Sequence, residues 1–340
     1  MPDPAKAREP PIRCGIIGYG KMGRIRAEAI RESGRGVVQG IYDPVNPAPD
    51  GLHAYSDETA LIEDPAIDAV FVCTPNYRIP DLCKQALSAG KHVFAEKPPA
   101  FNAAQLEEVI AVEKQAGKVL MYGFNHRHHA SIQKMKQIVD SGELGKILWM
   151  RGRYGKEVDE AYFKGWRADP KLAGGGILLD QGIHMLDLFL YFAGPFDEIH
   201  ALVSNLFWKT PGLEDNVFAI MKNSQSGVCA SLHSTMTQWR YLFSLEVFLE
   251  KGALVLNGLK TSSGAYGDED LAIKRNTRNP EQGQFDQEEH LVYKTNISWG
   301  SEVELFFDSL AANKVPLLGS SACALNLMNT IDKIYDTGQD

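Results

Sequence analysis

The sequence has few cysteines, and none of them forms a Cys-x-x-Cys pair. The cysteines are scattered and their number, five, is odd. This pattern argues against a disulfide framework and against a thiolate zinc site, and it favours a reducing compartment, which we expect to be the cytoplasm. We interpret the cysteines as small buried hydrophobic side chains. They are Cys14, Cys73, Cys83, Cys229 and Cys323.

Two further absences limit the expected partners. No apolar run approaches the roughly 18 residues that a membrane span needs, and the N-terminal MPDPAKAREPP has no apolar segment after its charges, so it resembles a disordered lead-in more than a signal peptide. The net charge is −8 and the chain has no basic run, which disfavours nucleic acid and membrane surfaces as partners. We therefore expect a small-molecule partner.

The chain does contain enough apolar material for a sizeable core. Of its 340 residues, 44% are hydrophobic and 23% are charged, and this length favours two domains. In the first third, short apolar runs alternate with helical patterns, which indicates βαβ units and a parallel sheet. The runs are apolar throughout, as expected for strands covered on both faces. The predicted strands are 12–18, 36–43, 66–74, 92–96 and 119–125.

The pattern changes after residue 128. A helix is predicted over 131–142, a strand over 145–155 and a helix over 174–193. Long β-rich runs then follow one another without helices, which predicts a largely antiparallel sheet. The polar stretch 267–289 predicts a surface excursion. The expected organisation is an α/β domain over 1–128 and an α+β domain over 129–340, whose large open sheet is mostly antiparallel.

A glycine pattern after the first strand predicts a dinucleotide site. The G-x-G-x-x-G pattern lies between a predicted strand and a predicted helix, and this context makes it much stronger evidence than the pattern alone. The first glycine permits a tight turn, the second lets the backbone approach a pyrophosphate, and the third lets helix and strand pack closely. The helix N-terminus offers free N–H groups to the phosphates. The residues are Gly18, Tyr19, Gly20, Lys21, Met22 and Gly23.

Two later segments extend this predicted site. Asp43 lies 20 residues past the last glycine, where a carboxylate binds a ribose 2′-hydroxyl and repels a 2′-phosphate, so we favour NAD over NADP, which an arginine from elsewhere could still accommodate. Its alternative role is to begin the turn that follows. Thr74, Pro75 and Asn76 end another strand, so we expect them beside the ribose–nicotinamide end, with a purely structural turn as the alternative.

Three polar side chains, Lys97, Asp180 and His184, are candidates for catalysis, and Glu96 and Lys97 are also candidate cofactor contacts. Glu96 and Lys97 follow a parallel strand, near the expected nicotinamide, where a lysine can hold a substrate hydroxyl. Asp180 and His184 are four residues apart, hence neighbours on one helical face. We expect Asp180 to bind another substrate hydroxyl or to fix the imidazole, and the glycines 174–176 before it to let the backbone pass close to cofactor and substrate. A histidine near its ordinary pKa of about 6.5 can accept a hydroxyl proton. The alternatives are an exposed Glu-Lys pair and a helix turn whose acid and histidine are satisfied structurally.

These motifs together resemble the Gfo/Idh/MocA family of glucose–fructose oxidoreductases and inositol dehydrogenases. In order they are GIIGYGKMG (15–23), TPN (74–76), AGKHVFAEKP (89–98), GELGKI (142–147), WR (166–167) and GGGILLDQGIHMLDL (174–188). The resemblance implies a Rossmann domain followed by a domain with a large antiparallel sheet. It also implies that Lys97, Asp180 and His184 face a nicotinamide. Many members carry a histidine where this chain has Ile79, so we expect no catalytic role for that turn.

Further candidates lie around these motifs. Arg127, Trp166 and Arg167 are candidate substrate contacts, since a guanidinium suits a carboxylate or phosphate. Tyr154 and Lys156 are weaker candidates. The histidine-rich run 126–129 lacks a carboxylate at metal-binding spacing, so we expect no metal.

The expected activity is NAD(H)-dependent hydride transfer at a secondary alcohol or ketone of a sugar, cyclitol or nucleotide-sugar. The alternatives are a glycosidase that retains NAD and works by transient oxidation, and a non-catalytic NAD(P)-sensing regulator. A homodimer or homotetramer formed through the open sheet is expected, because a large uncovered sheet face would expose too much apolar area.

Overall fold

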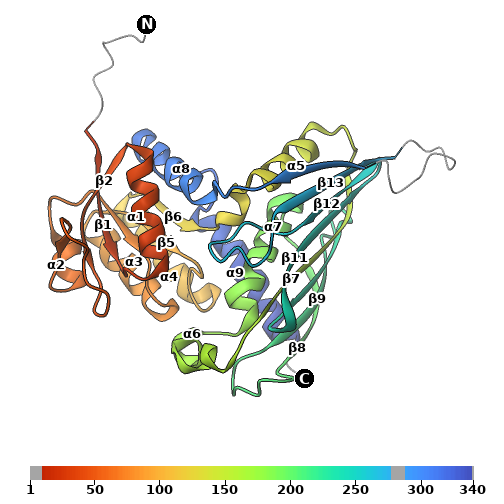
Figure 1. Cartoon of the computed structure of the whole chain (residues 1–340), viewed down its shortest axis with the longest axis horizontal. Coiled ribbons are helices and arrows are strands. Elements are labelled where there is room, and N and C mark those ends of the chain that lie inside the picture. The colour runs from red at the N-terminus through yellow and green to blue at the C-terminus, as the bar shows by residue number, and fades with distance from the viewer. Residues whose placement is uncertain (1–9, 277–287, 339–340) are drawn as a thin grey trace, which may run out of the picture.

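The computed structural model describes residues 10–276 and 288–338, and Figure 1 shows two sheets side by side. The first sheet is parallel, with strand order β3-β2-β1-β4-β5-β6. This is the strand order of a dinucleotide-binding Rossmann fold. The strands are β1 (Ile12–Ile17), β2 (Gly36–Tyr42), β3 (His53–Ala54), β4 (Ala69–Val72), β5 (His92–Glu96) and β6 (Leu120–Gly123). The predicted α/β half is confirmed.

The helices around this sheet begin and end at residues that the sequence marks. The Asn102 side chain accepts a hydrogen bond from the Gln105 N–H at 2.9 Å at the start of α4, and α4 ends at Gly117 in a left-handed conformation. The helices are α1 (Lys21–Ser33), α2 (Glu58–Glu63), α3 (Ile79–Ser88) and α4 (Ala103–Ala116), with short 3₁₀ turns at Asn76–Arg78 and Asn125–His128.

The second sheet has the order β14-β13-β12-β11-β7-β10-β9-β8, and its neighbours are antiparallel except for the parallel pair β7 and β10. This confirms the mostly antiparallel open sheet. The whole stretch 267–289 was expected to be a surface excursion, which is wrong for Glu269–Arg275, because they form β13; residues 277–287 lie outside the described residues. The strands are β7 (Ile147–Glu157), β8 (Glu198–Ser204), β9 (Asn216–Lys222), β10 (Cys229–Thr235), β11 (Thr237–Leu249), β12 (Gly252–Asn257), β13 (Glu269–Arg275) and β14 (Glu289–Tyr293).

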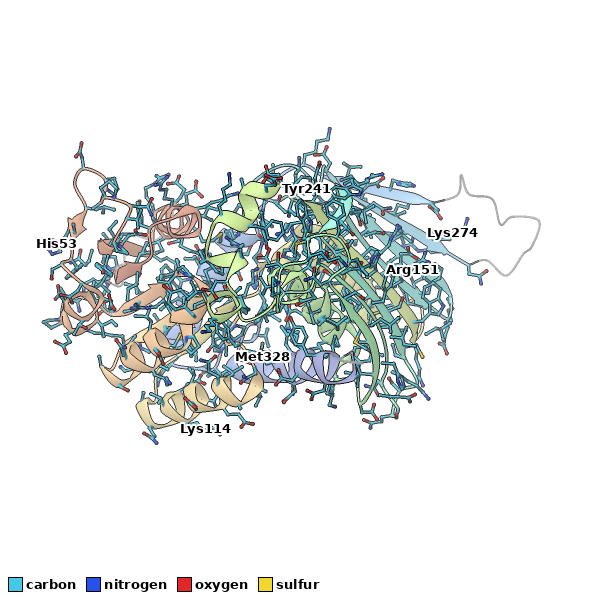
Figure 2. All side chains as sticks on the ribbon, turned by 90° about the horizontal axis from the view of Figure 1, so that it is seen from below. His53, Lys114, Arg151, Tyr241, Lys274 and Met328 are labelled. Atoms are coloured by element: carbon cyan, nitrogen blue, oxygen red, sulfur yellow. The ribbon has the colours of Figure 1, made fainter. Side chains whose placement is uncertain are left out.

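Helices cover one face of this sheet, and the other face is open (Figure 1). On the open face, Phe218 stacks on His233 at 3.9 Å and Trp149 stacks on Phe248 at 4.0 Å between ring centroids. Figure 2 labels Arg151, which pairs with Glu246 on the same face. The helices of this half are α5 (Ala130–Ser141), α6 (Pro170–Ala173), α7 (Ile183–Ala193), α8 (Ser298–Ala312) and α9 (Ser321–Thr337). None of the helices in the described part of the chain is long and apolar enough to span a membrane.

Helix α8 comes late in the chain but packs against the parallel sheet. Its Phe306 packs edge-on against Phe71 of β4 and Phe94 of β5, with centroids 5.5 and 5.7 Å away. The fully buried Arg26 of α1 donates to Glu96 of β5 and to Glu302 of α8, both at 2.7 Å. A boundary at residue 128 remains a prediction, and the α8 contacts show that the two halves share a core.

Removing Glu302 should destabilise the protein more than removing a surface carboxylate. Glu302→Ala leaves the buried Arg26 with only one partner, so we expect the free energy of unfolding to fall by about 3 kcal/mol. Glu304→Ala, which breaks the half-exposed pair with Arg35, should cost less than about 1 kcal/mol. Denaturant unfolding of both variants measures the difference, and equal losses would contradict a structural role for the buried pair.

Candidate active site

The glycine loop before α1 leaves space for a ligand at one position only. Gly18 has a φ of 90°, and a Cβ atom there would lie 2.6 Å from the Cys73 carbonyl oxygen. A Cβ at Gly23 would lie 2.1 Å from the Gly18 oxygen, so both positions require glycine for the fold. A Cβ at Gly20 would meet no atom within 4 Å. The N-terminus of α1 is therefore open beside Gly20, which fits the backbone approach of a pyrophosphate.

Asp43 lies at the end of β2 and binds the glycine loop. Its Oδ2 accepts from the Tyr19 N–H at 2.6 Å, and its Oδ1 accepts from the N–H groups of Val45 and Asn46. Burial alone would raise the pKa of Asp43, but the backbone N–H groups hold it below its ordinary value. The carboxylate thus stays charged. It begins the turn that follows β2, and it also binds the glycine loop.

The predicted turn 74–76 joins the two halves of the molecule. Asn76 Nδ2 donates to the Ala173 carbonyl at 2.9 Å, which ties this turn to the end of α6. The Thr74 hydroxyl is buried and has no hydrogen-bond partner within the described residues. An unpaired hydroxyl at the carboxyl end of a parallel strand is available to a dinucleotide, so these residues fit an NAD site.

Asp180 lies in a π-helical turn (Leu178–Gly182) and is surrounded by cations. Lys156 Nζ of β7 lies 2.5 Å from Asp180 Oδ2. On the other oxygen, Oδ1, Lys97 Nζ and Arg167 Nε both lie at 3.7 Å, and Lys97 also donates to the Asp180 backbone carbonyl. The Tyr162 hydroxyl donates to Oδ2 at 3.1 Å. The carboxylate therefore joins the end of β5 in one sheet to β7 in the other.

The charges in this cluster determine which groups are ionised. Burial would raise the pKa of Asp180, but the ammonium groups of Lys156 and Lys97 hold it far below its ordinary value, so it is a carboxylate. Burial lowers the pKa of Lys97, and the neighbouring cations lower it further, although Asp180 opposes them. One negative and three positive groups leave a surplus of positive charge at the end of β5.

His184 follows on α7, and its ring stacks on His126. The ring centroids are 3.8 Å apart and the planes differ by 13°. Burial, and then the charge of Lys97, hold the pKa of His184 well below 6.5, so the expected ordinary pKa of this histidine is wrong. Asp180 was expected to bind a substrate hydroxyl or to fix the imidazole. The second role is not seen, because the hydrogen-bond partners of its carboxylate in the described chain are Lys156 and Tyr162.

The hydrogen bonds of His126 fix its own tautomer. Its Nδ1 lies 3.1 Å from Asn125 Oδ1, and its Nε2 lies 3.2 Å from the Tyr154 hydroxyl. An Nδ1–H donor and an Nε2 acceptor satisfy both contacts. Burial, with the neighbouring His184, lowers the pKa of His126 well below 6.5. His126 is therefore a neutral ring that lies flat against the candidate base.

The other predicted site residues are placed as follows. Glu96 is bound to Arg26, behind Lys97. Arg127 donates to both oxygens of Asp187, at 2.7 and 2.6 Å, and both side chains are buried, so it lies in a structural ion pair and not in the Asp180 cluster. Trp166 lies beneath the Arg167 guanidinium, with 4.3 Å from the carbon Cζ to the ring centroid.

The glycine run 174–176 was expected to let the backbone approach cofactor and substrate. In the structure it packs against protein instead. A Cβ at Gly176 would lie 2.0 Å from the Glu214 carbonyl oxygen, and a Cβ at Gly174 would lie 2.1 Å from Phe101. The Glu214 carboxylate accepts from the N–H groups of Gly176 and Leu178 at 2.8 and 2.9 Å. The glycines thus allow a carboxylate from elsewhere in the chain to cap this helix.

Sequence reasoning underestimated Lys156 and missed Tyr162 and the role of His126. Lys156 could have been found from the alternation along its strand, because it shares the inward face of β7 with Tyr154. A buried lysine on a strand needs a partner of opposite charge. Tyr162 comes from the 3₁₀ turn Glu160–Lys164, which has no local pattern pointing to Asp180. Among the described residues, no three histidine, cysteine or carboxylate side chains are arranged to hold a metal.

Comparison with known proteins agrees with this geometry. Residues 12–124 match the model of the oxidoreductase family with an NAD-binding Rossmann fold, and residues 132–255 match the GFO/IDH/MocA C-terminal domain. The chain belongs to the Gfo/Idh/MocA family of NAD-binding oxidoreductases. The resemblance that the motifs indicated is therefore confirmed.

Named relatives of this family member are sugar and cyclitol dehydrogenases. The myo-inositol 2-dehydrogenase of Thermotoga maritima is 29% identical over 275 residues, 76% of this chain and 79% of that protein. The D-glucoside 3-dehydrogenase of Escherichia coli is 29% identical over 248 residues, 64% of this chain and 68% of that protein. A levoglucosan dehydrogenase solved with NADH and levoglucosan superposes with a TM-score of 0.82 at 21% identity, over 97% of each chain, which shows the shared fold.

Replacing His126 should separate the effect of ring stacking from that of hydrogen bonding. His126→Ala removes the ring that holds the His184 plane, so we expect kcat to fall by about tenfold, with NADH affinity unchanged. The acid limb of the pH–rate profile should move up towards 6.5, because water replaces the buried ring. His126→Phe keeps a flat ring and should retain most of kcat. Equal losses in both variants would contradict the stacking account.

Proposed function

We propose that this protein oxidises a secondary hydroxyl of a sugar, cyclitol or nucleotide-sugar with NAD, or reduces the corresponding ketone. One observation carries the proposal. The structure brings Lys97, Asp180 and His184 together at the carboxyl end of β5, where ligands bind in doubly wound sheets. The named relatives, among them myo-inositol 2-dehydrogenase and D-glucoside 3-dehydrogenase, support this substrate class.

The chain's own residues handle the proton and the developing charge. A bound nicotinamide would supply the acceptor or donor of the hydride. His184 is neutral and takes the proton of the substrate hydroxyl as the C–H bond breaks. The Lys97 ammonium stabilises the oxygen that becomes negative in this step. Asp180, held by Lys156 and Tyr162, keeps Lys97 in place and accepts a second substrate hydroxyl.

The cofactor contacts follow from the same geometry. The loop from Gly18 to Gly23 would hold the pyrophosphate at the N-terminus of α1, and the turn 74–76 and Lys97 would contact the ribose–nicotinamide part. Asp43 would accept from the ribose hydroxyls and would repel a 2′-phosphate, which favours NAD over NADP. Arg167 and Trp166 contact the substrate from the side of Asp180.

Lys97→Met and His184→Ala should each lower kcat by at least about 100-fold, because each removes one of the two groups that handle the hydroxyl proton. NADH formation from a panel of inositols, sugars and methyl glycosides measures kcat, and a fluorescence titration should show unchanged NADH affinity. Lys84→Met, which removes a surface lysine paired with Glu108, serves as the control. Wild-type rates in both site variants would reject the mechanism.

The same assay separates this activity from the alternatives. An NAD-retaining glycosidase would release an aglycone without net NADH, and a sensing regulator would bind NAD without turnover on any sugar of the panel.

The rate of oxidation should depend on the pKa values of His184 and Lys97. Because the pKa of His184 is lowered, His184 stays neutral and the rate should be kept when the pH falls to 6.5. Because the pKa of Lys97 is also lowered, Lys97 loses its charge and the rate should decline before pH 10.5 is reached.

We further propose that two or four copies associate through the open face of the large sheet, in the cytoplasm. The apolar side chains of Ile220, Phe218 and Trp149 on that face are 61%, 48% and 38% exposed, and the Phe218 and Trp149 rings stack on side chains of neighbouring strands. Phe218→Asp with Ile220→Asp should yield monomers in sedimentation equilibrium. A wild-type protein that is monomeric in the same experiment would reject this assembly.

A further inference from the structure

A row of aromatic side chains leads from Asp180 to the protein surface. Its members, which we name the aromatic strip, are Tyr162, Phe163, Trp208, Phe207 and Trp239. Centroids of successive rings are 5.1 Å apart for Tyr162 and Phe163, and 4.7 Å apart for Phe163 and Trp208. Phe207 and Trp239 follow, with their centroids 4.9 Å apart. The strip begins at the Tyr162 hydroxyl, which donates to Asp180.

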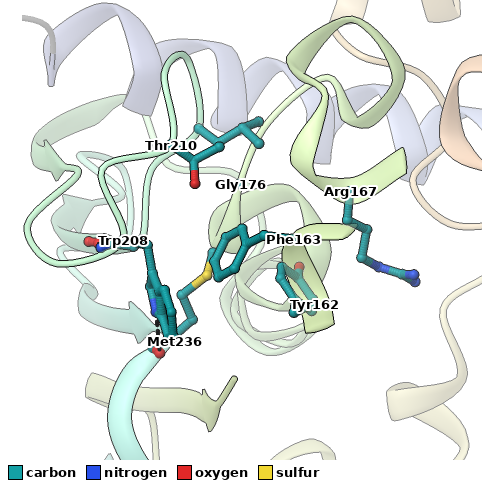
Figure 3. A pocket seen from close by; sticks show the side chains of 9 residues that line it. Tyr162, Phe163, Arg167, Gly176, Trp208, Thr210 and Met236 are labelled. Carbon is teal, nitrogen blue, oxygen red and sulfur yellow. Dashed lines mark hydrogen bonds between the residues drawn. The ribbon is translucent and has the colours of Figure 1, made fainter. Parts of the chain in front are cut away.

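A narrow pocket of about 10 Å³ lies along the first part of this strip (Figure 3). Tyr162, Phe163 and Trp208 line it together with Met236 and Thr210; Arg167 also borders it, but its guanidinium points away from these rings. Arg167 also lies 3.7 Å from Asp180, so the pocket and the Asp180 cluster share a wall. Beyond the pocket the rings become accessible, since Phe207 is 56% exposed and Trp239 is 53% exposed.

The loop that carries two of these rings is held rigidly by one buried carboxylate. Asp215 accepts hydrogen bonds from the backbone N–H groups of Leu206, Phe207 and Trp208, at 2.8, 2.8 and 2.9 Å. The Asp215 carbonyl accepts from the Met236 N–H at 2.9 Å, which ties this loop to the start of β11. A surface loop fixed in this way presents its rings without an ordering cost on binding.

Trp239 is held in a conformation that a tryptophan rarely adopts. Its φ is 56°, and β11 departs from regular pairing with β7 between Thr237 and Leu242. The surrounding structure therefore maintains a strained backbone in order to place an exposed indole at the end of the strip. Such strain on a solvent-facing aromatic residue points to a ligand contact.

We infer that the substrate is a glycoside whose second ring lies on the aromatic strip, while the ring to be oxidised lies at Asp180 and His184. This inference rests on the proposed function. The C–H faces of a sugar ring and the face of an aromatic aglycone both stack on tryptophan and phenylalanine rings. The strip is longer than one sugar ring, and the Thr210 hydroxyl at its border suits a hydroxyl group of the ligand.

The test compares three glucosides on the full-length protein loaded with NADH, which cannot oxidise them. Calorimetric titration gives Kd for methyl β-D-glucoside, phenyl β-D-glucoside and cellobiose. We expect the phenyl glucoside, cellobiose or both to bind about tenfold more tightly than the methyl glucoside. A gain for the phenyl glucoside assigns the strip to aromatic aglycones, and a gain for cellobiose assigns it to a second sugar. In Trp239→Ala the gain should vanish, whereas Trp239→Phe should keep most of it.

Leu317→Ala, which removes an exposed apolar side chain at a different pocket, beside Tyr293 and Ile297, should keep the full gain. Equal Kd values for the three glucosides in the wild type, or no binding of any of them, would overturn the inference. So would a Trp239→Ala protein of lower molecular mass in sedimentation, because the strip would then be a contact between copies. A ring preference without NADH formation from any sugar would reject the proposed function alone and leave the binding site standing.

Discussion

One carboxylate links the end of the parallel sheet to the antiparallel sheet. Asp180 lies between Lys97 from the end of the parallel sheet, Lys156 from the antiparallel sheet and Arg167 from the segment between them. A buried carboxylate is stable there only because cations surround it, and the cations are held in place because they share it. The surplus of positive charge is suited to stabilising a developing alkoxide, and it also disfavours a proton on His184.

Lys97 is held in place by its own contact with Asp180 and by the ion pair of the residue before it. The residue before it, Glu96, is bound to the buried Arg26, which also binds Glu302 of α8. A helix from the end of the chain therefore supports the strand that carries the candidate catalytic lysine. Because this lysine is packed between two buried ionic clusters, it has little freedom to move, as electrostatic stabilisation of a transition state requires.

The sequence predicts the parallel half well, because its signals are local. A glycine pattern between a strand and a helix, and apolar runs separated by helices, involve only neighbouring residues. It predicts that Lys97, Asp180 and His184 are important, but not what surrounds them. Tyr162 reaches Asp180 from a short turn, and Glu214 caps the glycine run from 38 residues away. Contacts of this kind, and the lowered pKa of a buried histidine, depend on tertiary packing that periodicity does not encode.

We propose that His184 stays neutral beside the cationic Asp180 cluster and can therefore accept a proton. The most direct test is a titration of the His184 imidazole by nitrogen NMR in the NAD-bound protein, assigned with His184→Ala. We expect the ring to be neutral still when the pH is lowered to 6.5 and to take up a proton only well below that value. Protonation of His184 at or above pH 6.5 would contradict it.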